Sequence, residues 1–179
     1  MEFRPKFADQ FFRESSVRGQ IITLTILVER IMDRYLCNHF GATKRKKQEL
    51  LDCVFGNERM TFESKKQVFQ VLLESYDNVF VNKNKTIFKD LEKIAMERNL
   101  VAHTLANFDD DILDEVEEQI SFIKFKNKEK VITYSAEKIN EHKTLLIDTM
   151  RKLVELNTMV ETSLRPGNHK SATEAKASS

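Results

Sequence analysis

Chain breakers and tryptophan are scarce in this sequence. It holds four glycines, two prolines and no tryptophan among 179 residues. Because glycine and proline interrupt helices more strongly than any other residues, their scarcity favours a mainly helical fold. A chain of this length can bury a sizeable core without disulfides or metals, so a single domain is expected.

Other absences exclude whole classes of protein. The two cysteines, Cys37 and Cys53, lie in apolar helical patterns without the spacing of a zinc site, so we expect reduced thiols in a cytoplasmic protein. The longest apolar run, IITLTILV, has eight residues and is too short to span a membrane. The N-terminus lacks the apolar core of a signal peptide. A formal net charge of +1 gives no overall attraction to nucleic acid, although a local basic patch can still exist.

Apolar residues recur at steps of three and four along most of the chain, which predicts a bundle of about five helices. Residues 1–14 are expected to form a short amphipathic helix. The first long helix is then expected to begin at Ser15 or Ser16, which can cap it, and to end at Gly41. Gly19 inside it indicates either a close approach by another backbone or ligand, or a frayed first turn. Further helices are predicted over about 44–55, 64–76, 86–103 and 135–163, and their inward-facing residues include Val54, Phe55, Val71, Leu72, Ile139, Leu146, Leu153 and Leu156.

Two segments break the helical pattern. Residues 120–134 alternate apolar and polar positions around KNKEK, which predicts a β-hairpin with a longer turn before the last helix. The acidic segment ahead of it contains Asp109–Asp111. It lacks the glycine and the spacing of a calcium loop, so we expect these carboxylates to begin a short helix and predict no metal site. We predict a single domain over 1–163 and a disordered tail over 164–179.

The segment RNLVAH, residues 98–103, ends the predicted helix over 86–103. Counting back from Arg98 gives Leu91 and Ile87, so the arginine is expected to continue the buried stripe. An unpaired buried guanidinium is very costly, so Arg98 needs a carboxylate partner, an edge or a cleft. Asn99 and His103 fall on one side of the helix, whereas Arg98 and His103 are about 140° apart. Spacing alone leaves two interpretations, ordinary helix-end residues or a site.

The same segment resembles the signature of the HEPN superfamily, the higher eukaryote and prokaryote nucleotide-binding domains. There an arginine, often followed by asparagine, precedes a histidine by a few residues, as Arg98, Asn99 and His103 do here. A second stretch, ESSVRGQIITLTILVERIMDRYL, is similar to the long first helix of HEPN proteins of the mannitol operon repressor type, with Arg18-Gly19 matching their Arg-Gly. The resemblance covers roughly residues 10–160 and implies a HEPN-like helical bundle.

The resemblance implies a homodimer in which two copies of the motif face each other and form a metal-independent endoribonuclease without a cofactor. His103 would then move a proton at the 2′-hydroxyl or the leaving oxygen. Arg98 would stabilise charge on the phosphate, and Asn99 would orient the phosphate or the histidine. These residue types suit that chemistry, because histidine titrates near neutral pH and a guanidinium donates two hydrogen bonds to phosphate.

Several other residues are secondary candidates. Arg18 could line the same cleft and bind a phosphate, or it could be an exposed residue of a first turn. Lys44 and Arg45 begin the basic run KRKK, which is either a solvated helix end or a patch that binds RNA phosphates. His142 lies near the apolar face of the last helix, where a structural role is favoured over a catalytic one.

Two function classes remain open. The first is an RNA-cleaving HEPN protein, such as a toxin or a phage-defence effector with an antitoxin partner. The second is a non-catalytic regulatory or protein-interaction module resembling the mannitol operon repressor family. A DNA-binding version of the second is weakened because the net charge is near zero and no helix-turn-helix with a basic recognition helix is evident.

Overall fold

The computed structural model describes residues 5–41, 43–57, 60–106, 120–126 and 128–163. These residues are mainly α-helical, as predicted, and a small antiparallel sheet precedes the last helix. The predicted tail over 164–179 and the acidic segment with Asp109–Asp111 lie outside the described residues.

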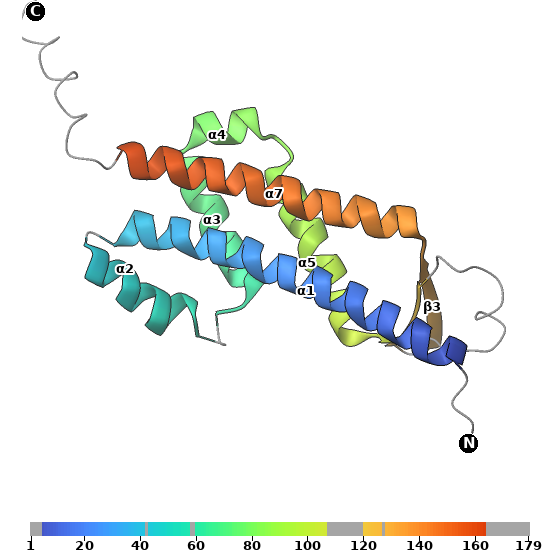
Figure 1. Ribbon diagram of the computed structural model, residues 1–179. Helices are drawn as coiled ribbons and strands as arrows, with labels where there is room; N and C mark the ends of the chain where they lie inside the picture. Colours follow the sequence, from blue (N-terminus) through green and yellow to red (C-terminus); the bar gives the residue numbers. More distant parts are fainter. Residues whose placement is uncertain (1–4, 42, 58–59, 107–119, 127, 164–179) are drawn as a thin grey trace, which may run out of the picture. The chain divides into compact units, whose positions relative to one another are not determined.

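The chain divides into two compact units. Unit 1 comprises Met1–Val28 and Lys85–Thr149, and unit 2 comprises Glu29–Asn84 and Met150–Ser179. The two longest described helices, α1 (Pro5–Phe40) and α7 (Ala136–Ser163), each contribute to both units (Figure 1). The single domain over 1–163 stays a prediction.

Helix α1 begins earlier than the sequence suggested. It is continuous from Pro5 to Phe40, so the predictions of a separate short helix over 1–14 and of a start at Ser15 or Ser16 are wrong. Proline suits a first helical position because its fixed φ matches the helix and its missing N–H is not needed there. Gly19 lies well inside the continuous helix, so the frayed first turn is wrong. It is exposed, and no described atom lies within 4 Å of the position of an added Cβ, so no other described backbone approaches it. A close approach by a ligand stays a prediction.

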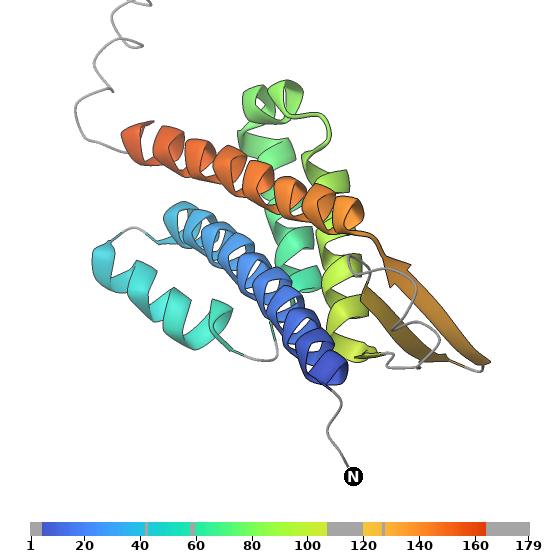
Figure 2. The same cartoon turned by 45° about the vertical axis from the view of Figure 1, so that its right-hand side comes forward.

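Unit 1 combines helix α5 (Ile87–His103) with the sheet. The strands β1 (Leu105–Ala106), β2 (Ile120–Lys126) and β3 (Lys128–Tyr134) pair antiparallel in the order β1-β2-β3. The predicted hairpin is confirmed. Its paired register continues to Lys126 and Lys128, so the turn is shorter than predicted. Figure 2 shows the hairpin leading directly into the start of α7.

The base of the hairpin joins the core of unit 1. Ile120 and Tyr134, which pair across the two strands, are buried together with Ile139 of α7. Val17 of α1 and Leu100 of α5 pack against this cluster. Burial of such side chains is the main stabilising contribution to a small unit. The remaining buried apolar side chains of unit 1 are Ile21, Val28, Ile87, Leu91, Ile94, Val101 and Leu146.

Unit 2 contains the last third of α1, the second half of α7 and four short or medium helices. They are α2 (Lys44–Leu50), the π-helical turn η1 (Leu51–Phe55), α3 (Phe62–Tyr76) and α4 (Asn78–Lys83). Figures 1 and 2 both show α2 alongside the second half of α1. The predicted helix over 44–55 is therefore an α-helix that continues as a π-helical turn. Helix α4 lies between the helices predicted over 64–76 and 86–103, in a segment for which no helix was predicted.

The inward-facing predictions for unit 2 are partly wrong. Phe55, Leu72, Leu153 and Leu156 are buried as predicted. Val54 and Val71 are instead 41% and 61% exposed. On α3, the buried face consists of Lys65, Phe69, Leu72 and Leu73, so the helix is rotated relative to the predicted stripe. The rotation accommodates a buried lysine that hydrophobic periodicity cannot reveal.

Lys65 is the buried cation of unit 2. It is 3% exposed, and its Nζ lies 2.6 Å from Glu29 Oε1 and 2.9 Å from Asp33 Oδ2. Burial raises the pKa of Asp33, and the hydrogen bond and charge of Lys65 partly oppose that rise. Such a group is tolerated in a core only because its charge is paired and hydrogen-bonded.

Two glycines make a matched test of this packing. An added Cβ at Gly41 would lie 2.5 Å from Lys47 Cγ and 2.7 Å from the Cys37 carbonyl oxygen. We expect Gly41→Ala to lower the free energy of unfolding by about 1–3 kcal/mol, because the backbone must shift. Gly19→Ala should instead raise it by about 0.5–1 kcal/mol, because an exposed helical glycine loses more entropy on folding than alanine. Urea unfolding of both variants measures this, and a loss of stability in Gly19→Ala equal to that in Gly41→Ala would contradict the account.

Candidate functional site

The last two turns of α5 carry a strip of exposed polar side chains, Arg98, Asn99 and His103, here called the α5 strip. All three are exposed, and Arg98 Nη1 donates a hydrogen bond to Asn99 Oδ1 at 3.0 Å. Asn99 and His103 are four residues apart and therefore neighbours on one face of the helix. The hydrogen bond brings the guanidinium beside that face, so the 140° separation does not isolate Arg98 from the other two.

The prediction that Arg98 extends the buried stripe of α5 is wrong. The buried face of the helix consists of Ile87, Leu91, Ile94 and Val101. A long guanidinium side chain near a helix end can reach solvent even when its Cα lies close to the apolar stripe. The sequence analysis left Arg98 a carboxylate partner, an edge of the protein or a cleft. Its side chain is exposed, so it lies at the protein surface.

The α5 strip has an exposed apolar neighbour. Met96 is 60% exposed. It precedes Asn99 by three residues and His103 by seven, so the three side chains share a helix face. Met96 thus places one exposed apolar side chain beside the polar groups of the strip.

Arg18 holds the end of α5. Its Nη1 donates to the carbonyl oxygens of Val101 and Thr104, at 2.9 Å for Thr104, and its Nε donates to Glu14 Oε1 at 2.7 Å. Val101 belongs to the last turn of α5, and Thr104 is the residue that follows the helix. Carbonyl groups at a helix end have no N–H partner in the helix and lie at the negative end of its dipole. The guanidinium of Arg18 thus donates to Glu14 and to the end of α5. These contacts stabilise the fold. A phosphate-binding role for Arg18 stays a prediction, and these contacts do not favour it.

Glu97, which precedes Arg98 on α5, forms a part-buried polar pair with Tyr134. Tyr134 of β3 donates its hydroxyl to the Glu97 carboxylate, and burial together with Glu97 raises the pKa of that hydroxyl. His142 of α7 is 4% exposed, and neither of its ring nitrogens has a hydrogen-bond partner within the described residues. Burial lowers the pKa of His142, which the charge of Glu97 partly opposes and that of Lys93 reinforces. A neutral, buried His142 agrees with the structural role that we favoured.

The two basic residues predicted on α2 have different surroundings. Arg45 is exposed and forms an ion pair with Glu49 at 2.9 Å. Lys44 is exposed, has no hydrogen bond or ion pair with another described residue, and lines a cleft of unit 2. The contacts of Arg45 are those of a solvated helix end, and a phosphate-binding role for Lys44 stays a prediction.

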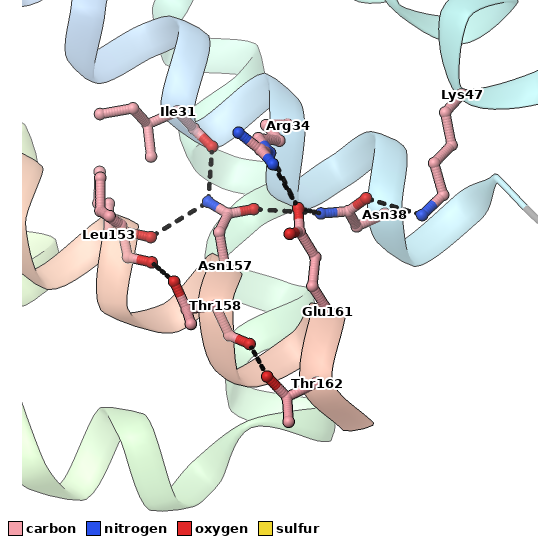
Figure 3. A network of polar contacts seen from close by, with 10 residues as sticks. Ile31, Arg34, Asn38, Lys47, Leu153, Asn157, Thr158, Glu161 and Thr162 are labelled. Carbon is pink, nitrogen blue, oxygen red and sulfur yellow. Dashed lines mark hydrogen bonds and ion pairs between the residues drawn. The ribbon is translucent and has the colours of Figure 1, made fainter. Parts of the chain in front are cut away.

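This α1–α2 cleft has a volume of about 990 Å³. Its polar wall is a network drawn in Figure 3. Glu161 accepts from Arg34 at 2.8 Å and from Asn38 at 3.1 Å, and Lys47 donates to Asn38 Oδ1 at 2.8 Å. The residues that line the cleft are Arg30, Asp33, Arg34, Cys37, Asn38, Thr43, Lys44, Lys47, Gln48, Leu51, Asp52, Gly56 and Glu161.

The sequence analysis missed this cleft. Arg30, Arg34 and Asn38 recur at steps of four along α1, so they form one polar stripe on a helix whose other face is apolar. That stripe could have indicated a polar surface on α1. Nothing in the sequence indicated that Glu161, more than 120 residues further along the chain, takes part in it.

None of the described helices combines the length and the hydrophobicity that a membrane span requires. No group of three or more His, Cys, Asp or Glu residues in the described part of the chain is arranged to hold a metal ion.

Neither a family model, nor a curated protein, nor a solved structure matches this chain. The resemblance to the HEPN superfamily therefore depends on the residues themselves, the α5 strip and the Arg18-Gly19 pair.

The structural role of Arg18 can be tested directly. Arg18→Ala removes the donors to two carbonyls at the end of α5 and leaves Glu14, which is 5% exposed, without this partner. We expect the free energy of unfolding to fall by roughly 2–3 kcal/mol. Arg13→Ala, on the exposed surface of the same helix, should change it little and serves as the control. Unchanged stability of Arg18→Ala together with weaker RNA binding would instead support the phosphate role.

The burial of His142 predicts a pH dependence of stability. Its pKa in the folded state lies below the ordinary value of about 6.5, so the unfolded chain takes up the proton first as the pH falls. The stability contribution is therefore present above about pH 6.5 and is lost as the pH falls below it. Urea unfolding at pH 7.5 and 5.5 should show a smaller decrease for His142→Leu than for wild type. His103→Gln, an exposed control, should keep the wild-type decrease, and an unchanged decrease in His142→Leu would refute the assignment.

Proposed function

We propose that the protein is a metal-independent endoribonuclease of HEPN type that acts through Arg98, Asn99 and His103. The observation that supports this most is that the α5 strip is exposed and joined by the hydrogen bond from Arg98 to Asn99. Three side chains of the motif are thus available to a substrate.

The chemistry follows from the groups in the strip. His103, exposed at the helix end, takes the proton of a ribose 2′-hydroxyl as general base. The 2′-oxygen then attacks the adjacent phosphorus, the bond from phosphorus to the 5′-oxygen breaks, and an imidazolium returns a proton to that oxygen. Arg98 donates two hydrogen bonds to the phosphate oxygens as negative charge builds on them. Asn99 holds the guanidinium in place, and its amide can donate to the same phosphate.

A second copy of the chain would complete this site. One imidazole cannot serve as base and acid at the same instant, and two facing strips supply both groups. Exposed Met96 on the strip's face gives such a dimer an apolar contact beside the polar groups. A nuclease of this kind would act as a toxin or a phage-defence effector and would need an antitoxin or another regulatory protein to restrain it.

The experiment is cleavage of total RNA and tRNA by the purified protein in EDTA. Wild type should cleave, and Arg98→Ala and His103→Ala should each reduce the rate by at least about 100-fold, because each removes a group that acts in the transition state. Asn99→Ala should have a smaller effect, because it removes a positioning contact.

Lys89→Ala is the matched control, since it removes an exposed cation from the same helix more than two turns before the strip. Circular dichroism establishes that all variants fold. Cleavage that persists in both Arg98→Ala and His103→Ala would contradict the proposal, and so would the absence of cleavage in wild type across both RNA pools.

The alternative function is a non-catalytic regulatory or protein-interaction module. One observation favours it: Val71 and Tyr76 of α3 and Val79 of α4, neighbouring elements of unit 2, are 61%, 70% and 76% exposed. Exposed apolar side chains of this size are common at protein-binding surfaces. A wild type that cleaves no RNA would favour this alternative.

A further inference from the structure

We infer that the α1–α2 cleft of unit 2 is a binding site for a phosphate-bearing ligand of nucleotide size. The inference is independent of the nuclease proposal, because no residue of the cleft belongs to the α5 strip.

The inference is based on the positively charged side chains that line the cleft. Four cations line it, Arg30, Arg34, Lys44 and Lys47. Arg34 is neutralised by Glu161 at 2.8 Å, but among the described residues the other three form no ion pair within 4 Å. Arg30 and Lys47 still interact over longer distances with the carboxylates of Asp33 and Glu161. A cleft lined by more cations than carboxylates concentrates anions, and guanidinium and ammonium groups are the usual ligands of phosphate.

The acidic residues of the cleft do not cancel this charge. Asp33 is already paired with buried Lys65 at 2.9 Å, and Glu161 is paired with Arg34. The remaining carboxylate, Asp52, is exposed and accepts a hydrogen bond from Gln48 at 2.8 Å. The net charge of the lining residues is therefore positive. Several cations can contact an anion, which suits a phosphate group better than a single carboxylate group.

The cleft is also held in place before a ligand arrives. Lys47 is fixed by its hydrogen bond to Asn38 Oδ1, and Asn38 in turn donates to Glu161 (Figure 3). Gly41 allows the close approach of α2 to α1, because a Cβ there would collide with Lys47 and Cys37. A site whose side chains are already ordered loses less entropy on binding.

The size and the remaining polar groups favour a nucleotide over inorganic phosphate. A cavity of about 990 Å³ has the volume of typical cofactor sites. Asp33 lines the cleft, is 4% exposed, and has an Oδ1 with no hydrogen-bond partner in the described part of the chain. Such an acceptor can receive a ribose hydroxyl or a base amine, which inorganic phosphate does not offer.

Isothermal titration calorimetry with the full-length chain tests the inference. The ligands are 5′-AMP, inorganic phosphate and a short single-stranded RNA, and the His103→Ala background prevents cleavage of the RNA. We expect saturable binding of 5′-AMP that is tighter than that of inorganic phosphate. Arg30→Ala and Lys44→Ala should each weaken it about tenfold or more, since each removes a charge-assisted contact.

Arg45→Ala is the control variant. Arg45 adjoins Lys44 on the same exposed helix but does not line the cleft, so its removal should leave the affinity within about twofold. Binding of RNA alone, with the same dependence on Arg30 and Lys44, would support the site and identify the phosphate source as a nucleic-acid strand. No binding of any of the three ligands at millimolar concentration, or equal weakening by Arg45→Ala, would overturn the inference.

Discussion

The attachment of Arg18 to the end of α5 is the interaction on which the candidate site depends. One guanidinium satisfies two carbonyls at the end of this helix and is itself neutralised by Glu14. Helix ends otherwise fray, because their last carbonyls have no N–H partners in the helix. With α5 fixed up to its final residues, Arg98, Asn99 and His103 are presented on an ordered turn. The arginine that the sequence suggested for the substrate thus supports the residues that would contact it.

Buried hydrogen bonds and ion pairs also fix the positions of helices within unit 2. Lys65 is inside the core because Glu29 and Asp33 neutralise it, and Asn157 donates to the carbonyl oxygens of Ile31 and Leu153 at 3.1 Å (Figure 3). Such bonds have directions, whereas apolar contacts do not, so they fix the rotation of α1, α3 and α7 within the unit. The polar wall of the α1–α2 cleft continues this network to the surface. The side chains that stabilise unit 2 therefore overlap with those that line the proposed binding site.

The sequence predicted the parts of the fold that depend on periodicity and local capping. The ends of helices at Phe40, Tyr76 and His103 and the presence of the hairpin follow from such local signals. The early start of α1, the rotation of α3 around Lys65 and the short α4 depend on tertiary contacts, which periodicity does not contain. For the site, the sequence indicated the three residues of the α5 strip. It could not indicate that Arg98 is exposed or that Glu161 joins the cleft.

The central claim is that a histidine-based, metal-independent reaction takes place at the end of α5. The chemistry of the RNA ends tests it most directly. A reaction begun by the 2′-oxygen leaves a 2′,3′-cyclic phosphate on one fragment and a 5′-hydroxyl on the other. Mass spectrometry of the fragments of a defined RNA oligonucleotide, incubated with wild-type protein in EDTA, should therefore show these two ends. Fragments with a 5′-phosphate and a 3′-hydroxyl would require water as the nucleophile and would contradict the account.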